Sequence, residues 1–331
     1  MIPYTRKTLP NGLTVVVNRD RASKLAAVNI LYRVGARNEN PARTGFAHLF
    51  EHLMFRGTRA VENFDLPVQM ASGDNNAFTN NDYTDFYITL PKDNLETALW
   101  LESDRMEGLD ITPAKLEAEK KVVIEEFRQR YLNQPYGDQT MLLRALAYKV
   151  HPYRWAAIGL ATDHIAGATL ADVESFYRAH YRPSNAILSI SADMEEERML
   201  ELAEKWFAPL ADHPSATAAI PQESMQTQAR RQEVERDVPA STVTVAYHMC
   251  ARTKPDFYTA DLVSDLLSGG DSGRLYTHLV KERNLLSSVN AYITGDVDPG
   301  LFVLTGHLLP GRTVEEAEAA FAREIEELQT L

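Results

Sequence analysis

The pentapeptide His48-Leu49-Phe50-Glu51-His52 is the stretch from which the fold of this sequence can be worked out. Residues three and four apart are neighbours on an α-helix, so His48, Glu51 and His52 share one face of a single turn. The rest of the segment is apolar, namely Phe46, Ala47, Leu49, Phe50, Leu53, Met54 and Phe55. This pattern predicts a largely buried helix, on which ionisable groups need a partner or a metal ion.

The face shared by the two histidines suits zinc, because two neutral imidazoles on one turn can bind the same ion. A catalytic zinc site has three protein ligands and a water whose pKa falls to about 7. Glu51 is then placed to accept the proton of that water. The order His-x-x-Glu-His is the inverzincin pattern. We therefore predict one zinc ion per chain; the alternative is an amphipathic helix whose polar side carries these residues without a metal.

A second helix, predicted from Pro113 to about Tyr131, is the best source of a third ligand. Thr112 can cap it, and proline is favoured at a first helical position. Its predicted apolar face consists of Leu116, Val122, Val123 and Phe127. Glu119 and Glu126 lie two turns apart beside that face, where a carboxylate without a cation is costly. Glu125 competes with Glu126 for the role of ligand, and a solvated helix face is the other alternative.

The pentapeptide and the run EKKVVIEEF at residues 119–127 together resemble the pitrilysin and insulin-degrading-enzyme family, which includes mitochondrial processing peptidase. The resemblance implies a zinc metalloendopeptidase, a hydrolase acting on peptide bonds. It makes Glu126 the third zinc ligand and Glu119 an accessory catalytic carboxylate beside Glu51. It also implies an α+β fold, a repeated α/β domain whose largely antiparallel sheet is flanked by helices.

A second resemblance to the family covers residues 73–84, before an alternating strand at 86–90. In the family, the strand that begins at the Asn-Ala pair is an open sheet edge beside the zinc. An edge strand can bind an extended peptide by adding it to the sheet. The substrate-binding candidates are therefore Asn76, Ala77, Phe78 and Thr79. The alternative is an Asn-rich turn that precedes an ordinary strand.

The 331 residues are too many for one ordinary core, which predicts two domains. We expect a zinc-bearing domain at 1–210, a linker at 211–232 rich in Ala, Ser, Pro and Gln, and a second domain at 233–331. Residues 260–267 can be aligned with 47–54, but the metal ligands are lost. The segments 290–292 and 314–328 likewise resemble 76–78 and 95–106, so the second domain is expected to be an incomplete repeat, about 100 residues short.

The second half departs from the family pattern at two positions. Family members that act alone carry an Arg and a Tyr, seven residues apart, that hold the substrate and the reacting carbonyl. The matching positions here are Val280 and Ser287. The resemblance therefore implies the zinc-bearing subunit of a heterodimer, whose related partner supplies the Arg/Tyr pair. The alternatives are a non-catalytic scaffold or binding subunit, and a peptidase that is active on its own.

Composition limits the partners of the chain. The net charge of −12 argues against nucleic acid and is compatible with a peptide substrate. No run of 18 apolar residues and no signal-peptide core are present, which predicts no membrane partner and a cytoplasmic location, or a periplasmic one if a signal peptide has been removed. The single cysteine, Cys250, lies in an apolar run and predicts a buried free thiol.

Overall fold

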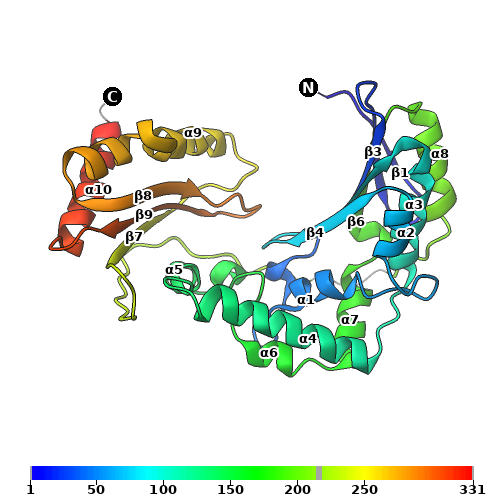
Figure 1. The fold of residues 1–331 in the computed structure, drawn as a ribbon, viewed down its shortest axis with the longest axis horizontal. Helices are drawn as coiled ribbons and strands as arrows, with labels where there is room; N and C mark the ends of the chain where they lie inside the picture. The colour runs from blue at the N-terminus through cyan, green and yellow to red at the C-terminus, as the bar shows by residue number, and fades with distance from the viewer. Residues whose placement is uncertain (1, 214–217, 330–331) are drawn as a thin grey trace. The chain divides into compact units, whose positions relative to one another are not determined.

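The computed structural model describes residues 2–213 and 218–329. The chain divides into two compact units, which are described separately below (Figure 1). The first unit consists of residues 1–132 and 150–224, and the second consists of residues 133–149 and 225–331. Residues 133–149, which lie inside the range expected for the first domain, thus belong to the second unit.

In the described part of the first unit, the strands form one sheet in the order β1-β2-β6-β3-β5-β4. Every neighbouring pair is antiparallel except β2 and β6, which are parallel. The strands are β1 (Thr5–Thr8), β2 (Thr14–Arg19), β3 (Leu25–Tyr32), β4 (Asp74–Thr79), β5 (Thr84–Pro91) and β6 (Ala186–Ala192). This largely antiparallel sheet agrees with the fold expected from the sequence.

Alternation of side chains along the strands buries one face of this sheet. On β3 the buried residues are Ala26, Val28, Ile30 and Tyr32, two apart as the pleat requires. Helices α3 and α8 pack on the central strands, whereas α1 contacts β4 and β5. The helices of this unit are α1 (Phe46–Leu53), α2 (Asp65–Met70), α3 (Leu95–Glu107), α4 (Pro113–Phe127), α6 (Thr162–Ala166), α7 (Leu170–His180) and α8 (Glu196–Phe207).

Helix α4 confirms most of the predicted second helix and corrects two details. Thr112 caps it by accepting a hydrogen bond from the Lys115 backbone N–H at 3.2 Å. The α-helix ends at Phe127, and a π-helical turn then follows from Arg128 to Leu132. Val122, which was predicted to lie on the apolar face, is 44 % exposed. The buried stripe runs through residues 116, 119, 120, 123 and 127, and position 122, one i+3 step from Glu119, lies at the margin of this stripe.

The second unit has its own small core. Its strands pair antiparallel in the order β7-β9-β8. The elements are β7 (Thr242–His248), β8 (Leu286–Ile293), β9 (Leu301–Leu308), α5 (Gln139–Ala147), α9 (Asp256–Ser268), α10 (Val314–Leu328) and a π-helix (Tyr276–Glu282). The main elements of this unit follow the chain order β7, α9, β8, β9, α10. This order matches that of β3, α1, β4, β5, α3 in the first unit. Pairing is also alike, because β9 lies between β7 and β8 as β5 lies between β3 and β4 in its sheet.

Polar contacts explain why α5 joins the second unit. The Gln139 side chain donates to Thr305 Oγ1 on β9 at 3.1 Å, and the Tyr136 hydroxyl donates to the Ala240 carbonyl at 2.7 Å. Both partners lie far away along the chain, so no local pattern signals the contact. Cys250, which follows β7, is a free thiol of intermediate exposure and is not buried as expected.

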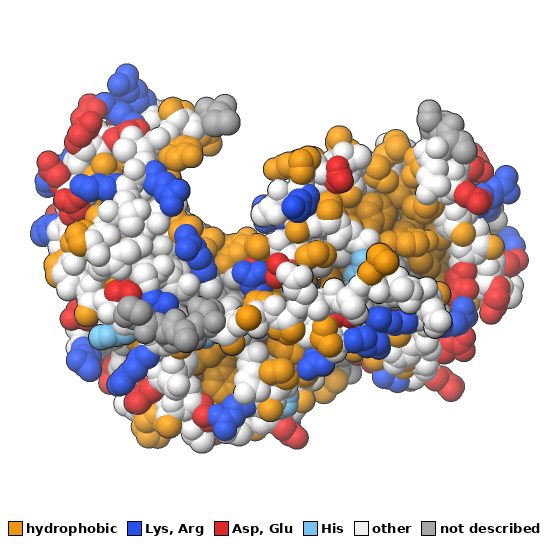
Figure 2. All heavy atoms as spheres, turned by 180° about the vertical axis from the view of Figure 1, so that it is seen from behind, with side chains coloured by type: hydrophobic (Ala, Val, Ile, Leu, Met, Phe, Trp, Pro, Cys, Tyr) orange, Lys and Arg blue, Asp and Glu red, His pale blue; other side chains and the backbone are white. Residues whose placement is uncertain are grey.

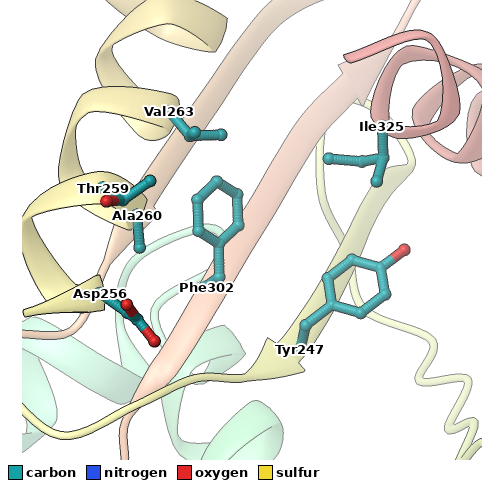
Figure 3. A pocket seen from close by; sticks show the side chains of 7 residues that line it. All are labelled: Tyr247, Asp256, Thr259, Ala260, Val263, Phe302 and Ile325. Carbon is teal, nitrogen blue, oxygen red and sulfur yellow. The ribbon is translucent and has the colours of Figure 1, made fainter. Parts of the chain in front are cut away.

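Apolar surface is prominent on the second unit. Figure 2 shows hydrophobic side chains gathered over this unit, on the right of that view, and its exposed apolar residues include Tyr258, Leu262 and Leu266 of α9. Close by, a cavity of about 360 Å³ lies between α9, α10, β7 and β9 (Figure 3). Its lining consists of Tyr247, Asp256, Thr259, Ala260, Val263, Phe302 and Ile325. With one carboxylate and two hydroxyls among these side chains, it offers no constellation for catalysis.

Candidate metal centre

Helix α1 is held at its first turn by a buried carboxylate. Its N-terminal neighbour Gly45 has φ +91°, and a Cβ there would lie 2.6 Å from the Ile158 carbonyl oxygen. The Glu39 side chain accepts hydrogen bonds from the backbone N–H groups of Gly45 and Ala47, at 2.8 and 2.9 Å. These donors would otherwise be unpaired at a helix start. Glu39 therefore fixes the helix that carries the pentapeptide.

The apolar side of α1 packs into the first unit as predicted. Leu49, Phe50 and Leu53 are fully buried. The Phe50 ring stacks on Phe176 and Tyr181, with ring centroids 5.3 and 5.1 Å apart. This packing, about 2 kcal/mol for each large side chain removed from water, sets the rotation of α1 about its axis. The other side of the helix faces α4 and β4.

On that side, the structure brings His48 and His52 together with Glu126 of α4. The Glu126 Oε2 atom lies 3.1 Å from His48 Nε2 and 3.4 Å from His52 Nε2. The two imidazole rings meet edge to face, with centroids 4.8 Å apart. Glu125 points elsewhere: its side chain is 54 % exposed and pairs with Arg128 at 3.6 Å. Packing of α1 against α4 thus selects Glu126, not Glu125, for the cluster.

This cluster has the dimensions of a zinc site. One atom from each of His48, His52 and Glu126 lies within 4.8 Å of the others, and in the part of the chain that the structure describes no other such group occurs. Bonds of about 2.0–2.1 Å in tetrahedral geometry put neighbouring ligand atoms about 3.3 Å apart. The two Glu126 distances match that value. Two imidazoles and one carboxylate also leave a fourth position open, so the donor set fits zinc.

The charges of the cluster favour a cation between its side chains. Burial alone would lower the pKa of His52, but the hydrogen bonds that it donates to Glu119 and Glu126 outweigh burial and raise the pKa to about 9. The pKa of His48 is raised in the same way by Glu126 and Glu51. Hydrogen bonds from the two histidines hold the pKa of Glu126 far below its usual value. The carboxylates of this cluster therefore favour positive charge among the ligand atoms.

Glu51 and Glu119, the two expected catalytic carboxylates, have different surroundings. Glu51 is 17 % exposed, and its Oε2 lies 3.4 Å from His48 Nδ1. Glu119 is 1 % exposed and lies behind His52, with its Oε2 3.4 Å from His52 Nδ1 and its Oε1 2.5 Å from Arg56 Nη2. Burial raises the pKa of Glu51, whereas hydrogen bonds from His48 and Thr79 lower it, with a net decrease.

The substrate-binding candidates lie on the edge strand β4, beside α1. Among the described strands β4 pairs with β5 alone, so its other edge is free of sheet pairing. Asn76 and Phe78 are exposed, whereas Ala77 and Thr79 are half-buried on the opposite face. Thr79, which was expected to contact substrate, hydrogen-bonds the Glu51 side chain. The strand thus supports the general-base candidate as well as offering an open edge.

The two positions that the sequence matches to the family's Arg/Tyr pair lie in the second unit and hold Val280 and Ser287. Val280 lies in the π-helix and packs against the core of this unit. Ser287 lies on β8, where its hydroxyl donates to the His307 carbonyl at 3.3 Å. In α9, Asp261 and Asp265 stand where α1 has its histidines, and Ser264 donates to the Asp261 carbonyl at 2.8 Å.

Sequence reasoning missed Glu39, Arg56 and Arg130. Arg130 lies four residues after Glu126, and its Nη2 is 2.9 Å from Glu126 Oε1. That spacing is a readable helical signal. Glu39 and Arg56 act on partners outside their own helical turn, so nothing in the local sequence marks them. In addition, no helix among the described residues is long and apolar enough to cross a membrane.

Fold and cluster together define a class, that of mixed α/β proteins with largely antiparallel sheets and a candidate metal centre. Residues 14–155 match the family model "Insulinase (Peptidase family M16)", and residues 167–331 match "Peptidase M16 inactive domain". The chain belongs to the M16 peptidase family, which confirms the resemblance to pitrilysin and the mitochondrial processing peptidase.

Named relatives agree with this assignment. The chain is 32 % identical over 328 residues to the zinc protease PqqE of Helicobacter pylori, covering 97 % of this chain and 74 % of that protein. It is 25 % identical to a probable mitochondrial-processing peptidase subunit beta of Arabidopsis thaliana, covering 91 % of this chain and 59 % of that one. A crystal structure of a protease from Helicobacter pylori superposes with a TM-score of 0.93 at 31 % identity, over 100 % of this chain and 81 % of that chain.

Proposed function

We propose that this chain is the zinc-bearing subunit of a metalloendopeptidase. The observation that carries the proposal is the convergence of His48 Nε2, His52 Nε2 and Glu126 Oε2, with Glu51 beside them. His48, His52 and Glu126 would hold one zinc ion. When bound, the ion supplies a water of lowered pKa and polarises the peptide carbonyl.

The chain's own residues would then perform the proton transfers. Glu51 accepts a proton from the attacking water and delivers it to the leaving amine nitrogen. Its low exposure and the hydrogen bond from Thr79 keep the carboxylate directed at the site. Glu119 contacts His52 and Arg56, so its role is to orient the imidazole and not to move protons.

The open edge of β4 is the proposed site for the peptide. An extended substrate would pair with the free edge through backbone hydrogen bonds, while the exposed side chains of Asn76 and Phe78 contact its side chains. Ala77 and Thr79 contribute backbone on the same strand. Backbone pairing selects an extended conformation and leaves sequence preference to side-chain contacts.

A related subunit with the Arg/Tyr pair would complete the active site. Support comes from Val280 and Ser287, neither of which provides a guanidinium or a phenol at the matching positions. Without these donors the developing oxyanion lacks part of its stabilisation. We therefore expect turnover to rise at least about a hundredfold when the related subunit is added. A chain that cleaves peptides equally well alone would refute the need for a partner.

The test of the catalytic assignment compares Glu51→Gln with Glu125→Gln, an exposed glutamate outside the cluster. Glu51→Gln should retain one zinc per chain and lose at least about a hundredfold in turnover. Glu125→Gln should retain both the zinc and the wild-type turnover. Glu126→Gln should lose the zinc itself. If the wild-type chain holds no zinc, the non-catalytic scaffold alternative is correct instead.

A further inference from the structure

The turn that follows α4 brings a cation to the outer side of Glu126. The helix widens into a π-helical turn at Arg128–Leu132, a feature that is often found at functional sites. The Tyr131 ring packs on Phe127, with ring centroids 5.5 Å apart, and Phe127 is buried. This contact anchors the turn, and Arg130 Nη2 lies 2.9 Å from Glu126 Oε1.

The two oxygens of Glu126 therefore have separate partners. Oε2 faces the Nε2 atoms of His48 and His52, whereas Oε1 is bound by Arg130. A carboxylate with both oxygens free can rotate and bind a metal through either or both of them. With Oε1 held, the carboxylate presents Oε2 alone.

We propose that Arg130 is a positioning residue that keeps Glu126 a one-oxygen ligand of the metal centre. This inference rests on the proposed function. By occupying Oε1, the guanidinium prevents two-oxygen binding and so keeps a coordination position open for water or substrate. The Arg130 side chain is 66 % exposed, so the ion pair adds little to folding stability, and its main effect is on the ligand.

The same turn contains a matched control. Arg128 is 54 % exposed and pairs at 3.6 Å with Glu125, which lies outside the metal cluster. Arg128→Ala and Arg130→Ala each remove one exposed guanidinium from the same turn. They differ in whether the partner carboxylate is a candidate ligand.

The test measures zinc affinity of the purified chain by competition with a chelator, which does not depend on peptidase activity. Removing Arg130 frees Oε1 as a second donor and takes away a positive charge beside the ion, so Arg130→Ala should tighten zinc binding about tenfold, whereas Arg128→Ala should change it less than about twofold. Arg130→Lys should reverse part of this gain in affinity, because an ammonium can pair with Oε1 without the planar geometry of arginine. Circular dichroism of the metal-free variants should match the wild type.

A second measurement reports the binding mode directly. The visible absorption of a cobalt-loaded chain weakens as the coordination number rises, so Arg130→Ala should absorb less per cobalt than wild type and Arg128→Ala. Equal zinc affinity and equal cobalt spectra in Arg130→Ala and wild type would overturn the role of Arg130 while leaving the zinc site intact. A wild-type chain that binds neither ion would overturn the proposed function itself.

Discussion

At the scale of single residues, the carboxylates Glu51 and Glu119 show how surroundings assign roles. Both lie beside a candidate zinc-binding histidine, Glu51 next to His48 and Glu119 next to His52. Glu51 keeps 17 % of its side chain exposed and can reach a substrate, whereas Glu119 is enclosed between His52 and Arg56. A proton carrier needs access to the reacting atoms, so these exposures support the proposed role of Glu51 as the general base and argue against that role for Glu119.

Thr79→Val should reduce kcat about tenfold without removing zinc. The valine has nearly the same shape but cannot hydrogen-bond Glu51, so the general base is less often in position. Peptide turnover and zinc content are measured on the same samples, under the conditions in which the wild type is active. Thr79→Ser retains the hydroxyl and should restore turnover; a serine variant as slow as the valine variant would contradict this role.

Zinc affinity should rise with pH up to about 9. In the metal-free chain Glu119 and Glu126 raise the pKa of His52 to about 9, so below that pH zinc must displace a proton from His52. The folded-state pKa is raised, so each fall of one pH unit below about 9 should weaken binding at least about tenfold. Chelator competition between pH 6 and 9 measures how zinc affinity changes with pH. An affinity independent of pH would contradict the raised pKa of His52 as the cause.

At the scale of elements, α1 is the helix on which the centre depends, and two features outside the helix hold it. Glu39 caps its first turn, and the aromatic residues of α7 and Tyr181 pack against Phe50. The helix spans residues 46–53, too short to be stable alone. The position of the histidines is therefore a consequence of tertiary packing around α1.

Glu39→Ala should destabilise the first unit by about 2 kcal/mol. The change leaves the backbone N–H groups of Gly45 and Ala47 buried without an acceptor. Urea unfolding of the zinc-free chain gives the free energy of unfolding. Thr169→Ala, which removes the exposed cap of α7, serves as the control and should cost about 1 kcal/mol. If both changes lowered the free energy of unfolding equally, burial of the Glu39 cap would add nothing to stability.

At the scale of the whole molecule, the chain concentrates its chemistry in one of two units. His48, His52, Glu51 and Glu126 all lie in the first unit. The second unit repeats the order of β3, α1, β4, β5 and α3 in its own elements, but it has Asp261 and Asp265 where α1 has histidines. A repeated fold thus provides one candidate metal centre in the described residues.

Zinc should therefore raise the unfolding temperature of the first unit alone. A ligand that binds only the folded state stabilises it by about 2.7 kcal/mol at a hundredfold excess over Kd. Calorimetry with zinc and with a chelator should show one shifting transition, and Glu126→Gln should abolish the shift. A zinc-dependent shift of both transitions in the Glu126→Gln variant would place the binding elsewhere.

Local sequence by itself determined the helical face shared by His48, Glu51 and His52, the Thr112 cap of α4 and the period of the strands. These features depend on neighbours within a few residues, which backbone geometry places in fixed relation. Beyond that, the resemblance to the family supplied the expectation that Glu126 is the third ligand.

Only the tertiary structure decided that Glu126 rather than Glu125 faces the histidines, that Arg56 pairs with Glu119, and that Glu39 caps α1. The tertiary structure also placed residues 133–149 in the second unit. Each of these depends on how the helices rotate and pack, and that is settled by burial over the whole core, which no local spacing encodes.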